Sequence, residues 1–250
     1  MIARWVEEAT AVESSPPGTL HDVSYLPDGR VHLVFRLLAD GRADLSVRGP
    51  LTRAHYKRAA ALPACARVSF RAGGAYPFFG VPVDELTNRL VLLESLWGRD
   101  ANLLLERCVA EVDHGGDATP VILAALGDRM RRAPFEHASA RTARAAMQSL
   151  ALGEPVAHVA RTLGVSERHL RRAFTSTVGY SPKAFSRVAR FQRALSLLRE
   201  RRADLGSIAG EAGYSDQAHL NHEFRALSSQ TPLALVRGEA PARGNCQGSV

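Results

Sequence analysis

The sequence predicts an α+β protein, in which a β-rich N-terminal part with a helical subdomain precedes an all-α C-terminal part. Three observations support this prediction. Alternating hydrophobic patterns between turn signals fill residues 19–72, helical spacing follows residue 82, and one apolar frame occurs twice in the C-terminal part. With 250 residues, of which 46% are hydrophobic, the chain can bury a sizeable core in one large domain or two small ones.

The strands are predicted from the segment VHLVFRLL (31–38), which lies between the turn signals LPDGR (26–30) and ADGR (39–42). Its odd-numbered residues are all apolar, so a strand here places them on one face and the even-numbered residues on the other. We expect ADLSVRGP (43–50) to pair with it as a hairpin. Residues 66–82 are expected to form a strand, a Gly-Gly break and an aromatic loop.

Helical spacing begins after Pro82. Three segments are expected to form helices, at 83–98, 100–112 and 117–133. Pro134 is expected to end the third of them, and residues 131–141 mark the join to the C-terminal part. The small sheet followed by helices completes the predicted N-terminal part.

The C-terminal part contains one helix-turn-helix unit in two copies. The segments GVSERHLRRAF and GYSDQAHLNHEF begin at Gly164 and Gly213, an offset of 49, and Phe174 and Phe224 end them at an offset of 50. Each glycine can end a helix in the left-handed conformation. Ser166 can cap the next helix in the first copy, and Ser215 or Asp216 can do so in the second.

A long helix is predicted between the two copies, from Pro182 to Glu200. Ser181-Pro182 and Thr231-Pro232 each put a capping hydroxyl before a proline at the first helical position, so a further helix follows each unit. At ~1.5 Å per residue the long helix spans roughly 28 Å. Half-sites on one face of B-DNA lie ~34 Å apart, so this spacing favours tandem DNA binding.

The excess positive charge lies in the repeated segment. Residues 1–135 hold 16 basic and 16 acidic residues, whereas residues 136–237 hold 15 basic and 8 acidic ones. A basic segment on an otherwise balanced chain indicates a polyanionic partner, most often nucleic acid. The alternative is a charged surface that is simply solvated.

Residues from about 140 to 237 resemble the DNA-binding domain of the AraC family of bacterial transcription regulators. The motifs that carry the resemblance are VARTLGVSERHLRRAF followed by GYSPKAF, and IAGEAGYSDQAHLNHEF followed by Pro232. The resemblance implies seven helices, with two recognition helices in adjacent major grooves. The DNA contacts that it implies are Ser166, Arg168, Arg171, Arg172 and Thr175 in the first unit, and Gln217, Asn221, His222 and Arg225 in the second.

The second unit departs from the family pattern at two positions. The family commonly has an arginine where His222 stands and a glycine where Ser229 stands. The first unit has three arginines on its recognition helix, and arginine is the commonest reader of guanine O6 and N7. We therefore expect the first unit to contribute more to affinity, and the second to read more weakly or to prefer A·T pairs.

The N-terminal stretch FRAGGAYPFFGVPVDEL…LWG is similar to an N-terminal domain of one subgroup of AraC-type regulators, whose sheet is thought to be cupin-like. This resemblance implies sensing and self-association, and it names no ligand. Small ligands favour concave apolar walls with a few polar groups. On that basis the candidate effector-binding residues are His32, Arg36, Phe70, Arg71, Tyr76 and Phe79.

No catalytic residue, metal site or cofactor is predicted. His21, His32, His55 and His114 are scattered without metal-ligand spacing, and neither GxSxG nor a phosphate-binding loop is present. The cysteines Cys65, Cys108 and Cys246 are too widely spaced for a disulfide framework or a zinc site. The absence of a signal peptide and of an apolar run long enough to span a membrane favours a cytoplasmic protein.

Together these patterns predict a sequence-specific transcription regulator. Residues 1–133 would bind a small organic effector and form a homodimer, residues 136–237 would bind a double-stranded operator, and residues 238–250 would be a disordered tail. RNA polymerase would be a further partner of an activator. Two alternatives remain: a regulator whose N-terminal part binds a protein instead of an effector, and a DNA-repair enzyme with a reactive cysteine or a metal cluster.

Overall fold

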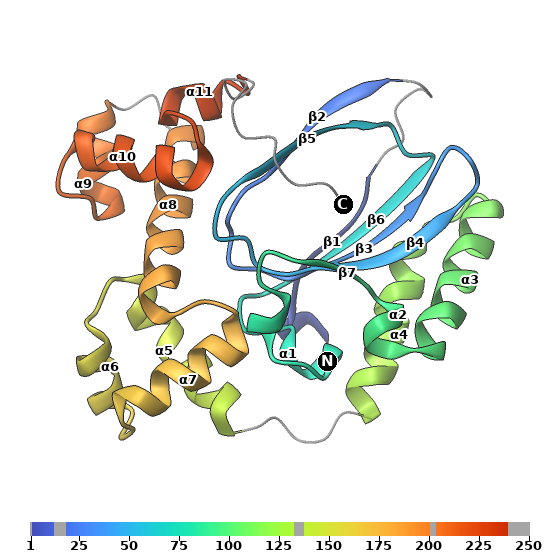
Figure 1. Ribbon diagram of the computed structural model, residues 1–250, viewed down its shortest axis with the longest axis horizontal. Coiled ribbons are helices and arrows are strands. Elements are labelled where there is room, and N and C mark those ends of the chain that lie inside the picture. Colours follow the sequence, from blue (N-terminus) through green and yellow to red (C-terminus); the bar gives the residue numbers. More distant parts are fainter. Residues whose placement is uncertain (1, 13–18, 133–137, 201–203, 240–250) are drawn as a thin grey trace.

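The structure, a computed structural model, describes residues 2–12, 19–132, 138–200 and 204–239. It consists of a β-rich N-terminal part with four α-helices and a helical C-terminal part, as expected from the sequence (Figure 1). A five-stranded antiparallel sheet has the order β1-β6-β3-β4-β7, and β2 and β5 form a separate two-stranded sheet. The strands are β1 (Val6–Val12), β2 (Leu20–Tyr25), β3 (His32–Leu37), β4 (Ala43–Arg48), β5 (His55–Ala60), β6 (Ala64–Phe70) and β7 (Leu90–Leu92).

The hairpin predicted from alternation is confirmed by β3 and β4, which pair with Leu33 opposite Val47 and Phe35 opposite Leu45. These four side chains are buried in the core, whereas His32 and Arg36 on the other face are only half-buried. The alternation therefore gives the sheet one apolar face and one polar face. Figure 1 shows the β2–β5 ribbon on the side of the sheet that the helices do not cover.

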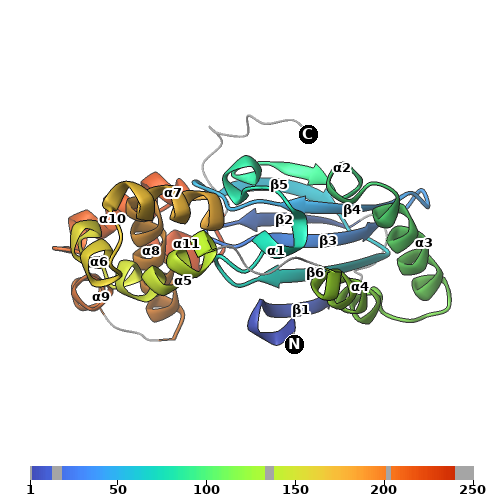
Figure 2. The ribbon, with the colours of Figure 1, turned by 90° about the horizontal axis from the view of Figure 1, so that it is seen from below.

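Four helices cover the apolar face, as Figure 2 shows from below. They are α1 (Tyr76–Phe79), α2 (Glu94–Trp97), α3 (Arg99–Asp113) and α4 (Ala118–Arg132). The Phe79 ring packs edge-on against Phe70 of β6 at 5.4 Å between centroids and stacks on Trp97 at 6.2 Å. The Trp97 indole nitrogen donates to the Phe78 carbonyl over 2.9 Å, so the buried ring keeps a hydrogen-bond partner.

Two predictions in this part were wrong in detail. The expected helix at 83–98 is a 3₁₀ turn (Val83–Leu86), then β7, then α2. Asn88 has a positive φ angle, which interrupts the helix. The following strand β7 pairs with β4, and in this strand Val91 is half-buried and Leu92 is exposed. The expected aromatic loop begins with α1. Strand β1, which pairs with β6, was not predicted.

The C-terminal part has the predicted arrangement of two helix-turn-helix units on a long helix. Its described residues form seven helices: α5 (Ala138–Ala151), α6 (Val156–Thr162), α7 (Glu167–Val178), α8 (Pro182–Glu200), α9 (Leu205–Ala212), α10 (Gln217–Ser228) and α11 (Pro232–Val236). The first unit is α6–α7 and the second is α9–α10. Helix α8 has the predicted ends and connects the units (Figure 1).

The local signals that define these helices are confirmed. The Ser166 hydroxyl accepts from the His169 backbone N–H, and the Asp216 carboxylate, rather than Ser215, accepts from that of His219. The φ angles of Gly164 and Gly213 are 66° and 89°, so both glycines take the left-handed conformation that ends the preceding helix. The hydroxyls of Ser181 and Thr231 cap α8 and α11.

Both recognition helices pack onto α8 through matching phenylalanines. Phe174 of α7 lies edge-on to Phe185, with 5.2 Å between the ring centroids, and Phe224 of α10 packs against Phe191 at 4.7 Å. Phe174, Phe191 and Phe224 are fully buried. The duplicated apolar frame thus has one structural purpose in each copy, which is to fix a recognition helix to the shared helix α8.

The predicted break at Pro134 and most of the predicted tail, residues 240–250, lie outside the described residues. Helix α4 is described as far as Arg132, within the predicted range 117–133.

Replacing Ser229 by glycine is expected to stabilise the second unit. Ser229 ends α10 with φ of 58°, the conformation that Gly179 takes at the end of α7 with φ of 84°. A side chain in this region costs roughly 1–2 kcal/mol, partly offset by the greater unfolded-state entropy of glycine. We expect Ser229→Gly to raise the free energy of unfolding by about 0.5–1 kcal/mol in urea titrations.

The matched control is Ser196→Gly, an exposed serine inside α8. There glycine should lower the free energy of unfolding by about 0.5–1 kcal/mol. A destabilised Ser229→Gly variant would contradict the strain assigned to this position.

Candidate functional site

The outward face of α7 carries free positive charge. Arg168, Arg171 and Arg172 are exposed, while Leu170 and Phe174 on the opposite face are buried. Arg171 pairs with Glu167 one turn earlier at 3.0 Å. Within the described part of the chain no ion pair involves Arg168 or Arg172, so their guanidinium groups can bind phosphate or a guanine edge.

The outward face of α10 is less basic. Gln217, His222 and Arg225 are exposed and Asn221 is half-buried. Glu223 is buried on the inner face, where Arg187 of α8 pairs with it at 2.6 Å. The remaining candidates of the first unit, Ser166 and Thr175, are exposed and half-buried respectively. All nine predicted DNA contacts are therefore at least partly accessible, and the two helices differ in charge as the sequence indicated.

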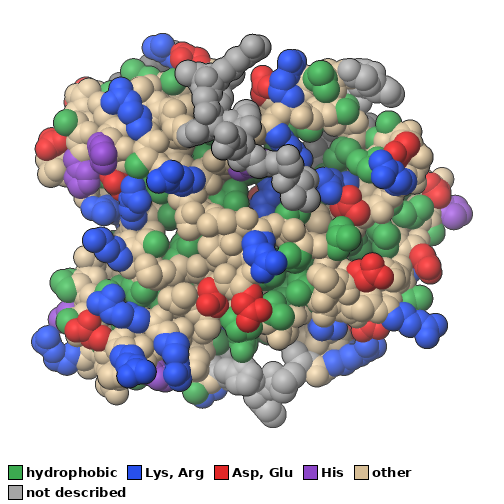
Figure 3. Space-filling view, in the orientation of Figure 1, with side chains coloured by type: hydrophobic (Ala, Val, Ile, Leu, Met, Phe, Trp, Pro, Cys, Tyr) green, Lys and Arg blue, Asp and Glu red, His purple; other side chains and the backbone are tan. Residues whose placement is uncertain are grey.

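Figure 3 shows basic side chains and histidines together over the C-terminal part, on the side away from α3 and α4. The sequence places the whole net charge of +7 in residues 136–237. Such a surface attracts a polyanion through a salt-dependent, sequence-independent term.

Two family models match the chain. Residues 159–238 match a helix-turn-helix domain, and residues 2–92 match a domain of unknown function, DUF6597. The helix-turn-helix match begins within α6 and covers α7, α8 and the whole second unit. Residues 159–238 are an AraC-type helix-turn-helix domain. The chain resembles two curated proteins over about a third of its own length, and it spans about a quarter of the length of each.

The first of these relatives is the uncharacterised HTH-type transcriptional regulator YidL of Escherichia coli (strain K12). It is 33% identical over 82 residues, which are 33% of this chain and 28% of that protein. The second is the HTH-type transcriptional regulator GlxA of Rhizobium meliloti (strain 1021), which is 38% identical over 79 residues, 32% of this chain and 24% of that protein.

Solved structures resemble the chain in fold. The C-terminal domain of AraT, a response regulator from Geobacillus stearothermophilus, is 21% identical, with a TM-score of 0.37 over 43% of this chain and 93% of that one. ToxT from Vibrio cholerae is 7% identical, with a TM-score of 0.46 over 92% of this chain and 98% of that one.

The N-terminal part contacts the AraC-type domain at the C-terminal ends of both recognition helices. The Leu51 carbonyl accepts from the Tyr180 hydroxyl just after α7. The Ala54 backbone N–H donates to the Leu227 carbonyl of α10 over 2.7 Å, and the Tyr56 hydroxyl donates to that of Ser228 over 2.7 Å. Residues 49–54, the β4–β5 connection, thus lie against both units together with the start of β5.

A second contact is made at Gly179, the residue that ends α7. The Thr87 hydroxyl donates to its carbonyl over 2.8 Å, and a Cβ at this position would lie 2.7 Å from the same hydroxyl oxygen. Glycine therefore serves both the helix end and the close approach of the N-terminal part. Gly179 corresponds to Ser229 at the repeat offset of 50, so the N-terminal part meets the two units at equivalent places.

A cavity of about 840 Å³ lies between the polar face of the five-stranded sheet and the β2–β5 ribbon. Helix α8 contributes Gln192, Leu195 and Arg199 to its wall, so the AraC-type domain helps to enclose it. The Gln192 side-chain amide also donates to the Pro27 carbonyl over 2.5 Å. The apolar side chains of the wall include Val23, Leu26, Val34, Leu38, Leu51 and Leu62. The basic ones are Arg30, Arg36, Arg48, Lys57, Arg67 and Arg199.

The structure separates the six candidate effector residues. His32 and Arg36 line the cavity. Phe70 and Phe79 pack in the core behind the sheet, while the exposed Arg71 and the half-buried Tyr76 do not line the cavity. Sequence reasoning missed Arg48, Tyr25 and Lys57. The alternation along β4, which carries Arg48 opposite His32, is the signal that could have located one of them.

The polar wall residues from the sheet are partly paired with acids. Arg36 makes a bidentate ion pair with Asp44, at 2.8 and 3.0 Å. His32 lies between Ser69 and Asp28, at 3.0 and 3.1 Å. These pairs fix the side chains in place, which makes the wall a preformed surface.

The described cysteines do not have the character of reactive thiols. Burial raises the pKa of Cys65, although the positive charges of Arg36 and Arg67 lower it in part, and burial raises the pKa of Cys108 to about 12. A nucleophilic cysteine needs the opposite shift. In the described ranges no three His, Cys, Asp or Glu side chains are grouped as metal ligands, and no helix is long and apolar enough to cross a membrane.

The contact at Tyr56 is expected to weaken in alkali. Partial burial raises the pKa of Tyr56 from 10.0 to about 12, although the Ser228 side chain lowers it in part. Folding therefore favours the neutral form of Tyr56. The contribution of Tyr56 to the free energy of unfolding is complete below pH 10 and is lost as the pH rises towards 12. Urea titrations of the wild-type protein between pH 9 and 12 should show this decline.

The control is Tyr56→Phe, which keeps the ring and removes the hydroxyl. The variant should be less stable at pH 9 by about 1 kcal/mol, the usual value of one hydrogen bond. Its stability should fall less steeply than that of the wild-type protein above pH 10. Parallel curves for the two proteins would show that Tyr56 contributes nothing to the pH dependence.

Proposed function

We propose that the protein is a transcription regulator that binds an operator through α7 and α10 and is controlled by a small organic effector. In this proposal residues 136–237 bind DNA, and residues 1–133 bind the effector and form a homodimer. The observation that carries the proposal is the pair of capped recognition helices on one rigid helix, with Arg168 and Arg172 on the outer face of α7 free of ion pairs to any described residue.

The DNA-binding half of the proposal is supported by geometry and charge together. Two helices on a 19-residue rod can reach successive major grooves, because the rod spans roughly 28 Å at ~1.5 Å per residue. Arg168, Arg171 and Arg172 would contact guanine edges and phosphates, while Gln217, Asn221 and His222 suit A·T-containing positions. Ser166, Thr175 and Arg225 would contact phosphates.

The effector half is supported by the cavity. Its volume of about 840 Å³ lies within the usual range of small-molecule sites, and its wall combines apolar side chains with a few fixed polar ones. Of the predicted effector residues, His32 and Arg36 are the ones that this cavity supports. A regulator controlled by a protein partner would not need such a wall.

Three further features belong to the proposal. Self-association is favoured by apolar side chains on the N-terminal surface, namely Leu90 and Leu92 on the edge strand β7 and Leu103 on α3. A cytoplasmic location and contact with RNA polymerase would follow if the protein activates transcription in a bacterium. We propose no catalytic activity, in keeping with the raised pKa of both described thiols.

The test is selection of duplexes from a random-sequence pool by the full-length protein. The recovered DNA should contain two half-sites about 10–10.5 base pairs apart. Its affinity should fall steeply with salt, with a logarithmic slope of about −0.9 for each phosphate contact. Recovery of no sequence, or salt-independent binding, would refute the proposed regulator.

We expect the two recognition helices to contribute unequally to affinity. Arg172→Ala should weaken binding to the selected duplex by roughly 1–3 kcal/mol, as expected for loss of an arginine contact to a base. His222→Ala should cost less, because α10 offers fewer charges. Gel-shift titrations at fixed salt would compare the two variants.

Arg107→Ala, on the exposed surface of α3, is the matched control and should leave DNA affinity unchanged. Equal losses for Arg172→Ala and His222→Ala would show that the difference in charge between the two units has no energetic consequence.

A further inference from the structure

The cavity has a marked imbalance of charge. Six arginine and lysine side chains line it, and Asp28 is its one acidic wall residue in the described part of the chain. Three of the six are neutralised by carboxylates. Arg36 pairs with Asp44 at 2.8 Å, Arg30 with Glu7 at 2.7 Å, and Arg67, more loosely, with Glu8 at 3.6 Å; these acids do not line the cavity. The positive charge that remains is therefore concentrated on few side chains.

Arg48, Lys57 and Arg199 carry that remaining charge; Arg199 belongs to α8, and Arg48 and Lys57 lie at the end of the sheet nearest the AraC-type domain. The Arg48 guanidinium stacks on the Tyr25 ring at 3.2 Å from its centroid, and the Lys57 ammonium lies 5.7 Å from the same centroid. In the described ranges neither has an ion pair. Stacking on a ring leaves the N–H edge of a guanidinium free for a planar acid group.

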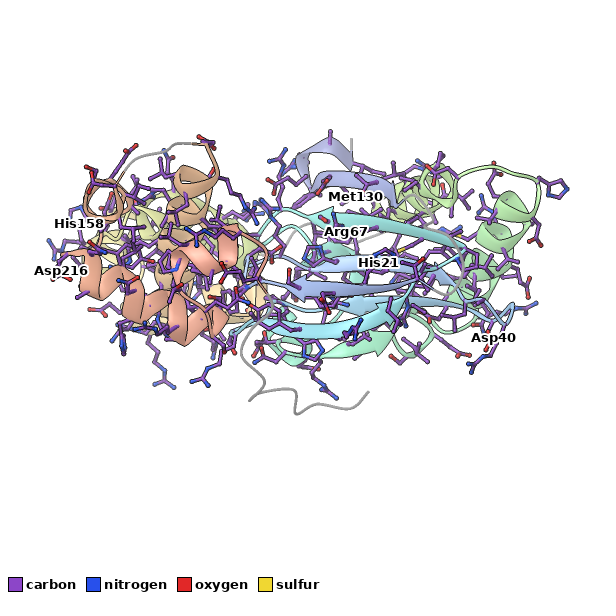
Figure 4. All side chains as sticks on the ribbon, turned by 90° about the horizontal axis from the view of Figure 1, so that it is seen from above. His21, Asp40, Arg67, Met130, His158 and Asp216 are labelled. Carbon is purple, nitrogen blue, oxygen red and sulfur yellow. The ribbon has the colours of Figure 1, made fainter. Side chains whose placement is uncertain are left out.

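Two further wall atoms lack a hydrogen-bond partner. His21 Nε2 and Arg67 Nε are buried, and neither has a hydrogen bond within the described residues. Figure 4 labels both residues, on β2 and β6 respectively. Buried polar atoms are seldom left unpaired, so a bound molecule with acceptor atoms would complete this wall.

The end of the cavity farther from the AraC-type domain is richer in apolar side chains, although His21 and the Arg36–Asp44 pair also lie towards it. Leu38 follows β3, Ala60 ends β5, and Leu62 lies just beyond it, all at the opposite end of these strands from Arg48 and Tyr25. A ligand that spans the cavity would thus meet charge at one end and mainly hydrocarbon at the other.

We infer that the cavity binds a small organic anion, with its acid group at Arg48 and Lys57 and its apolar body directed towards Leu38 and Leu62. This anion is the proposed effector. Only its effect on DNA binding rests on the proposed function. A carboxylate, a sulfonate or a phosphate monoester would satisfy the same two cations.

Such a ligand would act on both recognition helices through the β4–β5 connection. Arg48 ends β4 directly before this connection, and Lys57 lies in β5 shortly after it. Between them, Ala54 and Tyr56 bond to the end of α10, and Leu51 bonds to Tyr180 after α7. An acid group bound to both cations would fix the two ends of the segment and so change the contacts that it makes.

Binding is tested with the full-length protein and two fluorescent probes. The first is 8-anilinonaphthalene-1-sulfonate, and the second is N-phenyl-1-naphthylamine, which has the same rings without the sulfonate. The anion should bind at least about tenfold more tightly than the neutral probe, as expected for one charge-assisted hydrogen bond. Arg48→Met and Lys57→Met should each weaken anion binding about tenfold and leave the neutral probe unaffected.

The matched control is Arg58→Met, because Arg58 is the neighbour of Lys57 on β5 and lies on the exposed face. It should change neither affinity. Equal binding of the two probes, binding of neither, or unchanged anion affinity in both Arg48→Met and Lys57→Met would overturn the inference.

A second measurement uses the wild-type protein and needs no variant. Lys57 and Lys183 are the only lysines in the sequence, and Lys183 is exposed at the start of α8. The anionic probe should slow acetylation of Lys57 by an N-hydroxysuccinimide ester, as measured by mass spectrometry, and should not affect Lys183. Equal rates at Lys57 with and without the probe would place the anion elsewhere and refute the site.

The effect on DNA is measured separately with the selected duplex. Saturation with the anionic probe should change the dissociation constant of the wild-type protein and leave that of Arg48→Met unchanged. If DNA affinity does not respond although Lys57 is protected, the control through the connection is wrong and the anion site stands. If no duplex is recovered, the proposed regulator fails, and the probe and acetylation results still decide the ligand class.

Discussion

The packing of two phenylalanines onto one helix is the constraint on which the arrangement of the molecule depends. Phe174 and Phe224 each lie against a phenylalanine of α8, at 5.2 and 4.7 Å between ring centroids. Because α8 is one continuous helix of 19 residues, the two recognition helices cannot move independently without breaking one of these contacts. The same helix supplies Leu195 to the wall of the cavity, so the AraC-type domain and the cavity share a structural element.

The five-stranded sheet separates two functions by the direction of its side chains. Its apolar face packs on α1–α4 and forms the core, and its other face presents histidine and arginine to the cavity. Because neighbouring residues of a strand point to opposite faces, Phe35 and Arg36 serve these different purposes from adjacent positions. The acids that pair with Arg30, Arg36 and Arg67 lower the cost of keeping charge on this side of the sheet, whereas Arg48 and Lys57 have no such partner among the residues that the structure describes.

Features set by neighbouring residues could be predicted from the sequence, while those set by distant pairing could not. The ends of α8, the caps at Ser166 and Thr231 and the β3–β4 hairpin follow from local patterns. Strands β1 and β7 depend on partners far along the chain, and neither segment has a distinctive pattern of its own. The cavity was missed for the same reason, since its wall combines strands that pair at long range with one face of α8. His32 and Arg36 were found because they belong to the most regular alternation in the sequence.

The β4–β5 connection touches the two recognition helices at positions related by the internal repeat, the ends marked by Gly179 and Ser229. A shift of this segment would therefore reach both helices at once and would leave their outward side chains unchanged. Because α8 holds the two helices at a fixed separation, such a shift would move them as one body and would keep the rotational phase between their half-sites unchanged. A regulator built in this way would distinguish operators by the length and twist of the spacer, a property of the duplex that none of its side chains contacts.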